Sequence, residues 1–206
     1  MFKQQSFHIK LAEALDVSFS ACTKLFNLIY STYSDPIRHY HNVDHILEMF
    51  NVLKKSGLYD QASLLAVFFH DIVYDVNSRD NEHMSSDVCC DSLLEFGISP
   101  NVADRARFLI QLTADHIAPP GDELAAAFLD ADMAILGSQP FHYVDYSYDI
   151  AAEYSTFPNY IAERIKFLES LLERDHIYHT PYFRALFAKQ AIENITNELR
   201  FLNDRK

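Results

Sequence analysis

The scarcity of glycine restricts this chain to folds that need few tight turns. Only four glycines occur among 206 residues, and apolar side chains recur every three to four positions over long segments. That period is typical of amphipathic α-helices. We therefore predict an all-α protein, a bundle of roughly nine to ten helices. The same scarcity excludes a glycine-rich phosphate loop and a dinucleotide fingerprint.

Helix start and stop signals divide the chain into ten expected helices. They cover about residues 7–14, a second segment capped by Asp16 or Ser18, a third opened by residues 38–45 and running to Gly57, and then 62–73, 81–96, 100–113, 124–137, 140–154, 158–173 and 181–202. No linker, repeat or low-complexity tract interrupts this order. We predict a single domain over 1–206, with a core at about 34–206 and N-terminal helices at 7–33 packed on it.

The net charge of the chain limits the classes of molecule that it is expected to bind. The formal net charge is −12, and the 17 lysines and arginines form no long cluster. Duplex nucleic acid is not expected as a partner, whereas divalent cations are attracted to such a field. No apolar run is long enough to cross a bilayer, and the first residues lack the apolar core of a signal peptide. We expect a cytoplasmic protein without membrane contact; a homodimer is left open.

A histidine and an aspartate interrupt the most apolar stretch. His70 and Asp71 lie within the segment 66–74, AVFFHDIVY. Such a run is either an inner helix or a buried strand, and periodicity cannot separate the two. Ionisable side chains are rarely fully buried unless they are paired or bind a metal. The pair therefore predicts a buried functional site.

Other polar residues are candidates to join that pair. His41 and His45 are four positions apart and share one face if a helix has already begun there. Glu82 opens a later helix, and Asp130 and Asp132 lie within an apolar one. Two imidazoles with two carboxylates form a nitrogen and oxygen ligand set. That set suits Mn, Fe, Co, Ni, Zn or, more loosely, Mg.

These residues carry a resemblance to a known family. His45, His70-Asp71 and Asp132 resemble the H…HD…D pattern of the HD superfamily of metal-dependent phosphohydrolases, whose fold is an all-α HD-type bundle. Further segments resemble one bacterial subfamily of these proteins, from about residue 34 to the C-terminus: RHYHNVDHI at 38–46, Asn81-Glu82, LDADMAILG at 129–137, Glu153-Tyr154 and YHTP at 178–181.

The resemblance implies a metal ligand set of His45, His70, Asp71 and Asp132. The residues alone leave the choice between Asp130 and Asp132 open, and the resemblance favours Asp132. The implied cofactor is a divalent metal ion, Mn, Mg, Ni, Co, Fe or Zn, with one ion per chain. The implied reaction is hydrolysis of a phosphate ester by attack of a metal-bound hydroxide on phosphorus.

The resemblance also implies roles in catalysis. The segment from Tyr40 to His45 is similar to the YHNxxH segment of cyclic-nucleotide phosphodiesterases, which makes His41 the proton donor to the leaving oxygen. Asp71 or Glu82 would orient and deprotonate the attacking water. Arg38 and His116 would contact the substrate, which we expect to be a nucleotide or another small phosphorylated molecule.

Each role has a structural alternative. His41 could bond only backbone at a helix start, Glu82 could be an acidic first-turn residue, Arg38 could make a helix-entry salt bridge, and His116 could be a loop histidine. We expect His179 to fix the start of the last helix rather than to act in the site.

Two functional alternatives remain at this stage. Some HD-fold proteins are di-iron oxygenases, and His83 and His116 would then supply the additional ligands. The other alternative is a non-catalytic domain that senses a nucleotide and keeps its metal only for stability.

Overall fold

A computed structural model describes residues 2–204 and contains ten α-helices in that range, with no strand. The all-α prediction is confirmed. The α-helices are α1 (Phe2–Leu15), α2 (Thr23–Tyr33), α3 (Val43–Ser56), α4 (Gln61–Phe69), α5 (Asn81–Phe96), α6 (Pro100–Gln111), α7 (Glu123–Asp132), α8 (Pro140–Glu153), α9 (Tyr160–Glu173) and α10 (Pro181–Asn203). Two short 3₁₀ helices follow α6 and α7: η1 (Leu112–Ala114) and η2 (Met133–Gly137).

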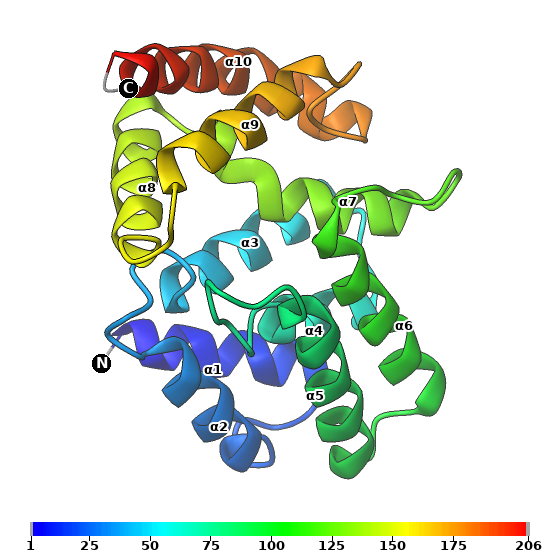
Figure 1. Cartoon of the computed structure of the whole chain (residues 1–206). Coiled ribbons are helices and arrows are strands. Elements are labelled where there is room, and N and C mark those ends of the chain that lie inside the picture. The colour runs from blue at the N-terminus through cyan, green and yellow to red at the C-terminus, as the bar shows by residue number, and fades with distance from the viewer. Residues whose placement is uncertain (1, 205–206) are drawn as a thin grey trace.

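The helices surround one continuous hydrophobic cluster. In Figure 1, α1, α2, α4, α5 and α6 occupy the lower part, α8, α9 and α10 the upper part, and α3 and α7 cross between them. Helix α1 packs against α3 and α4. Helices α3, α4 and α7 also contact one another in pairs. Those three helices position the candidate site.

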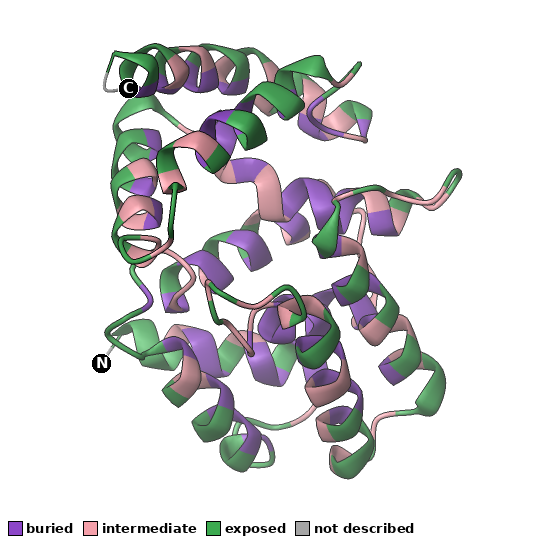
Figure 2. Ribbon diagram, viewed as in Figure 1, coloured by how far each residue is buried: buried purple, intermediate pink, exposed green. Residues whose placement is uncertain are grey.

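Helix α4 is an inner helix. Every residue from Ala62 to Phe69 is buried, which appears as an almost continuous purple segment in Figure 2. The helix begins at a capping box in which the Asp60 side chain accepts from Ser63 N and the Ser63 hydroxyl bonds the backbone of Asp60. The cap resolves the ambiguity between an inner helix and a buried strand, because it fixes a helical first turn.

Several helix ends differ from the predicted ones. Helix α1 begins at Phe2, α2 begins at Thr23 after Cys22 and is not capped by Asp16 or Ser18, and α7 ends at Asp132, where the 3₁₀ helix η2 follows.

Two further differences bear on the site. Helix α4 ends at Phe69 rather than at residue 73, so His70 and Asp71 lie in the turn that follows it. Arg38 donates to the carbonyl oxygens of Asp71 and Ile72, and these bonds hold that turn. Helix α3 begins only at Val43, because Asn42 caps it by accepting from Asp44 N. His41 therefore precedes the helix and does not share a helical face with His45.

The end of η2 lies directly against α10. A Cβ added to Gly137 would come within 2.5 Å of the Cβ and the carbonyl oxygen of Phe187, so only glycine permits this approach. The contact fixes the segment after Asp132 against the last helix. Among the helices of residues 2–204, none is both long and apolar enough to cross a membrane.

Candidate metal centre

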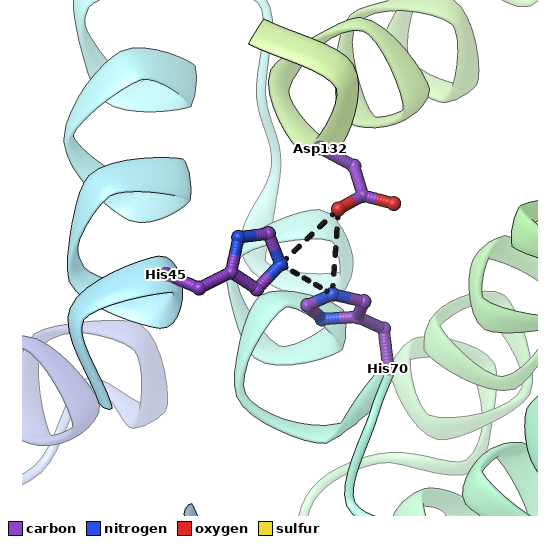
Figure 3. Close-up of side chains that lie close together, drawn as sticks. All are labelled: His45, His70 and Asp132. Atoms are coloured by element: carbon purple, nitrogen blue, oxygen red, sulfur yellow. Dashed lines mark hydrogen bonds and ion pairs between the residues drawn. The ribbon is translucent and has the colours of Figure 1, made fainter. Parts of the chain in front are cut away.

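Three side chains from three different helical segments converge in the interior. Figure 3 shows His45 from α3, His70 from the end of α4 and Asp132 from the end of α7 pointing toward one another. The imidazole Nε2 atoms of His45 and His70 are 3.0 Å apart. Oδ1 of Asp132 lies 3.2 Å from Nε2 of His45 and 3.5 Å from Nε2 of His70. Within the described chain, these are the residues whose donor atoms form a mutually close group suited to a metal ion.

Asp71 adds a second carboxylate at the edge of this group. Its Oδ2 lies 3.0 Å from Nε2 of His70 and 3.9 Å from Nε2 of His45. Its backbone N donates to the hydroxyl of Tyr33, and Arg38 holds its carbonyl oxygen. The Asp71 side chain is 19% exposed, whereas those of His45 and His70 are 4% and 1% exposed. The two histidines of the group are thus buried, and its two carboxylates, Asp71 and Asp132, are the more exposed members.

The tautomer of His70 suits a ligand. Its Nδ1 lies 3.0 Å from the carbonyl oxygen of Val67. A carbonyl oxygen only accepts, so Nδ1 carries the proton, and a neutral His70 presents the lone pair of Nε2 to the group. Histidines that ligate metals are oriented in this way by the bond from their other ring nitrogen.

The ionised side chains of the group shift the pKa values of one another. Burial opposes protonation of His70, yet the Asp71 and Asp132 carboxylates raise the pKa of His70 well above its usual value. Burial also opposes ionisation of Asp132, but His70 and hydrogen bonds from His116 and His45 keep the pKa of Asp132 well below its usual range. The pKa of Asp71 is lowered in the same manner, against burial, by His70 and His41. Two ionised carboxylates beside two imidazoles thus favour a cation at their centre.

The spacing fits a six-coordinate divalent ion. Donor atoms on neighbouring positions of an octahedral ion lie about 3 Å apart when each bond is about 2.1 Å long. The separations within His45, His70 and Asp132, and that from His70 to Asp71, lie at or slightly above this value. The donor set of two imidazoles and two carboxylates is one that Mn, Fe, Co, Ni or Zn accepts.

The structure separates Asp130 from Asp132. Asp130 is 1% exposed, and its two carboxylate oxygens accept from the backbone N atoms of His179 and Thr180 at 2.7 and 2.8 Å. Those bonds satisfy the donors at the start of α10, where Thr180 is the N-cap. Asp130 therefore faces α10, and Asp132, two residues later, faces the histidines.

His116 lies at the outer oxygen of Asp132. Its Nε2 is 3.0 Å from Oδ2 of Asp132, the oxygen that is turned away from His45 and His70. In turn, Nε2 of His179 donates to the carbonyl oxygen of His116 at 2.9 Å. The His116 ring thus contacts a candidate metal ligand, and its predicted contact with substrate stays a prediction. His179 was expected to fix the start of α10; its backbone N bonds to Asp130 there, whereas its ring bonds to the loop at His116.

His41 pairs with a glutamate that had no predicted role. Nδ1 of His41 lies 2.6 Å from Oε2 of Glu153, the last residue of α8. The same carboxylate accepts from the Tyr74 hydroxyl and from the backbone N atoms of Tyr40 and His41. Glu153 belongs to a segment of the family resemblance, and that was the one sequence signal pointing to it.

The pair leaves His41 ready to carry a proton. Burial opposes protonation, but the Asp71 charge and the hydrogen bond to Glu153 raise the pKa of His41. Burial also opposes ionisation of Glu153, but the bond from His41 lowers the pKa of Glu153. With Nδ1 bound to a carboxylate, Nε2 is the ring nitrogen of His41 to which no described residue hydrogen-bonds.

Arg38 bonds to backbone carbonyl oxygens and lines neither of the two cavities beside the metal group, so the structure favours its structural alternative. The residue is 8% exposed, and its guanidinium donates to the carbonyl oxygens of His41, Asp71 and Ile72 at 3.2, 2.6 and 3.1 Å. The guanidinium also lies near the rings of Tyr33 and Tyr74. A side chain so engaged has little capacity to bind substrate phosphate. Arg38 instead fixes the backbone that carries Asp71 and His41.

Two further candidates, Glu82 and His83, come from the first turn of α5. Among the described residues, Glu82 makes no hydrogen bond or ion pair with the four candidate ligands. The His83 side chain is 66% exposed and faces Asp87 on its own helix, α5, with 3.8 Å between Nε2 and Oδ2. His83 is therefore not among the residues that converge at the metal group, and its role as a ligand for a second metal stays a prediction. The predicted role of Glu82 stays a prediction.

A groove opens beside His45 and Asp132. It consists of two adjoining cavities of about 270 and 260 Å³. Both are lined by Tyr40, His45, Glu48, Ile135 and His142, and Asp132 lines the larger one. Carboxylates dominate the charged lining: Asp44, Glu48, Asp145 and Asp149. Within the described chain, Lys55 is the single lysine or arginine of that lining.

Comparison of the chain with protein-family models, curated proteins and solved structures gives no match.

Proposed function

We propose that this chain is a divalent-metal-dependent phosphohydrolase that acts on a small phosphate ester. The observation that carries the proposal is the convergence of His45, His70 and Asp132 within 3.0 to 3.5 Å of one another, with Asp71 at the edge. The order of these residues in the chain is that of the HD superfamily, whose members the sequence resembles.

The four residues would hold the ion through two Nε2 atoms and two carboxylate oxygens. When bound, such an ion lowers the pKa of a coordinated water toward neutrality and polarises a phosphoryl oxygen. Asp71 is the more exposed of the two carboxylates, so it is placed to accept a hydrogen bond from a water on the open side. Arg38 acts behind it by fixing its backbone.

His41 is the proposed general acid. Glu153 holds Nδ1 of His41, favours the protonated ring and leaves Nε2 to deliver a proton to the departing oxygen of the ester. A histidine whose second nitrogen is held by a buried carboxylate is a common arrangement for proton transfer. The ring of Tyr74 lies 4.4 Å from that of His41 and limits its rotation.

The groove supports a substrate with few negative charges. Its carboxylates, Glu48 among them, repel additional phosphates, and Lys55 is its single lysine or arginine within the described chain. A monoester or diester with one phosphoryl group fits this lining better than a nucleoside triphosphate. A di-iron oxygenase is less well supported, because His83 lies on the surface and His116 bonds to Asp132.

The test is hydrolysis of phosphomonoesters, phosphodiesters and nucleotides by the purified chain with Mn²⁺, Mg²⁺, Ni²⁺ or Co²⁺. We expect metal-dependent release of phosphate or of the alcohol product from at least one ester. His70→Ala should abolish this activity, and His41→Asn should lower kcat by about 10²-fold.

His83→Ala is the matched control, because it removes an exposed histidine that contacts no candidate ligand. Its activity should equal that of the wild-type chain. Absence of turnover across the whole panel would contradict the proposal, and nucleotide binding without turnover would indicate a sensor domain instead.

A further inference from the structure

His179 lies outside the metal group but is connected to it. Its Nε2 is 2.9 Å from the carbonyl oxygen of His116, and since a carbonyl only accepts, the ring nitrogen donates. The two residues are 63 positions apart, so this bond ties the segment before α10 to the loop that follows η1. Figure 1 shows α10 leading back from that segment over the upper part of the bundle.

The loop is held in an uncommon backbone conformation at the point of this bond. His116 has φ of 54°, in the left-handed region that residues other than glycine adopt infrequently. That conformation persists only where surrounding contacts impose it. The bond from His179 is one such contact, and it acts on the backbone of His116 itself.

The His116 ring connects the fixed backbone of this loop to the metal group. Its Nε2 lies 3.0 Å from Oδ2 of Asp132, while Oδ1 of Asp132 faces Nε2 of His45 at 3.2 Å. A carboxylate held at one oxygen in this way presents the other oxygen in a fixed direction. The position of Oδ1 therefore depends on the His116 ring, and the ring depends on the loop backbone.

The other end of the connection is anchored to the same helix. Oδ1 of Asp130 accepts from the backbone N of His179 at 2.7 Å, and Asp130 and Asp132 are both in the last turn of α7. Helix α7 thus holds His179 through Asp130, and His179 holds the loop whose histidine returns to Asp132. The connection forms a closed ring of contacts around the end of α7.

We propose that His179 is a positioning residue for the ligand Asp132 and acts on it through His116. The inference rests on the proposed metal site, and it assigns His179 no contact with metal or substrate. Loss of the His179 bond lets the backbone of His116 leave the left-handed region, and the His116 ring then moves away from Oδ2. The consequence is weaker metal binding.

A double-mutant cycle tests the connection. The metal dissociation constants of the wild type, His179→Ala, His116→Ala and the double variant are measured by competition with a chromogenic chelator for Mn²⁺ or Co²⁺. We expect each single variant to bind about 10-fold more weakly or worse. The double variant should match His116→Ala within about 2-fold, because the two changes break one connection. His179→Gln, whose amide can donate the same bond, should recover most of the affinity.

Arg174→Ala is the matched control: Arg174 follows α9 and bonds to the same loop. Arg174 donates to the carbonyl oxygen of Asp115 at 3.3 Å, so the variant removes a bond to the neighbouring residue without touching His116. Its metal affinity should stay at the wild-type value. Unchanged affinity of His179→Ala, or full additivity in the double variant, would overturn the positioning role alone. A wild-type chain that binds no metal would overturn the proposed function as well.

Discussion

The imidazole of His41 is joined to the carboxylate of Glu153 by a contact of 2.6 Å between Nδ1 and Oε2, across 112 positions of sequence. The Glu153 side chain is 1% exposed and accepts four hydrogen bonds, two of them from backbone N atoms. A buried carboxylate with so many donors stays ionised. It therefore fixes both the direction and the protonation of the proposed acid.

Glu153→Gln should move the pH dependence of catalysis. The proposed acid works in its protonated form, so activity is lost as the pH rises through the pKa of His41. Glu153 raises that pKa, so removing its charge should shift the alkaline limb of kcat/KM to lower pH. Tyr74→Phe removes one donor to the same carboxylate but keeps the charge, and it should not shift the limb downward. Identical limbs in wild type and Glu153→Gln would show that His41 is not the acid.

Arg38→Met should destabilise the chain, because it leaves the carbonyl oxygens of Asp71 and Ile72 without their buried donor. We expect a loss of about 2–4 kcal/mol in the free energy of unfolding, measured by urea denaturation, together with weaker metal binding. A side chain that bound substrate phosphate would behave differently. In that case KM would rise while the stability stayed the same.

His8 should make stability fall in mild acid. Its ring lies between those of Phe19 and Phe26, and its Nε2 is buried without a hydrogen-bond partner among the described residues. Burial lowers the pKa of His8, against a smaller opposing effect of the Phe19 backbone. Its contribution to stability is therefore present above the unfolded pKa of about 6.5 and is lost as the pH falls below it.

Denaturation at pH 7.5 and pH 5.5 measures this effect. His8→Phe should show a smaller loss of stability between the two conditions than the wild type. His83→Ala removes an exposed histidine and should retain the wild-type loss. An equal pH dependence of His8→Phe and wild type would contradict the account of His8.

The sequence was sufficient for the number and order of the α-helices in the described chain, because most helix signals are local. Ser99 and Pro100 mark the start of α6, and Gly57 and Gly97 lie in the left-handed conformation directly after α3 and α5. The end of α4 was misplaced because it depends on a distant residue: Arg38 holds the carbonyls of the turn after Phe69. No local pattern around residues 70–73 contains that information.

The sequence predicted which types of residue form the candidate site, but not which way each side chain points. Asp130 and Asp132 lie two positions apart in the same helix, and only the packing of α10 decides that Asp130 caps it. The role of Glu153 was not predictable, because it depends on the contact of α8 with the segment before α3, and these elements are far apart in sequence. The role of Arg38 was not predictable either, because it depends on the burial of its side chain in the tertiary structure.

The metal content of matched aspartate variants tests the central claim most directly. The wild type, Asp132→Asn and Asp130→Asn are purified, loaded with Mn²⁺ or Co²⁺, desalted and analysed by elemental mass spectrometry. We predict one ion per chain in the wild type, loss of the ion in Asp132→Asn, and retention in Asp130→Asn with a lower melting temperature. A wild-type chain without metal, or an Asp132→Asn variant that keeps a full complement, would contradict the account.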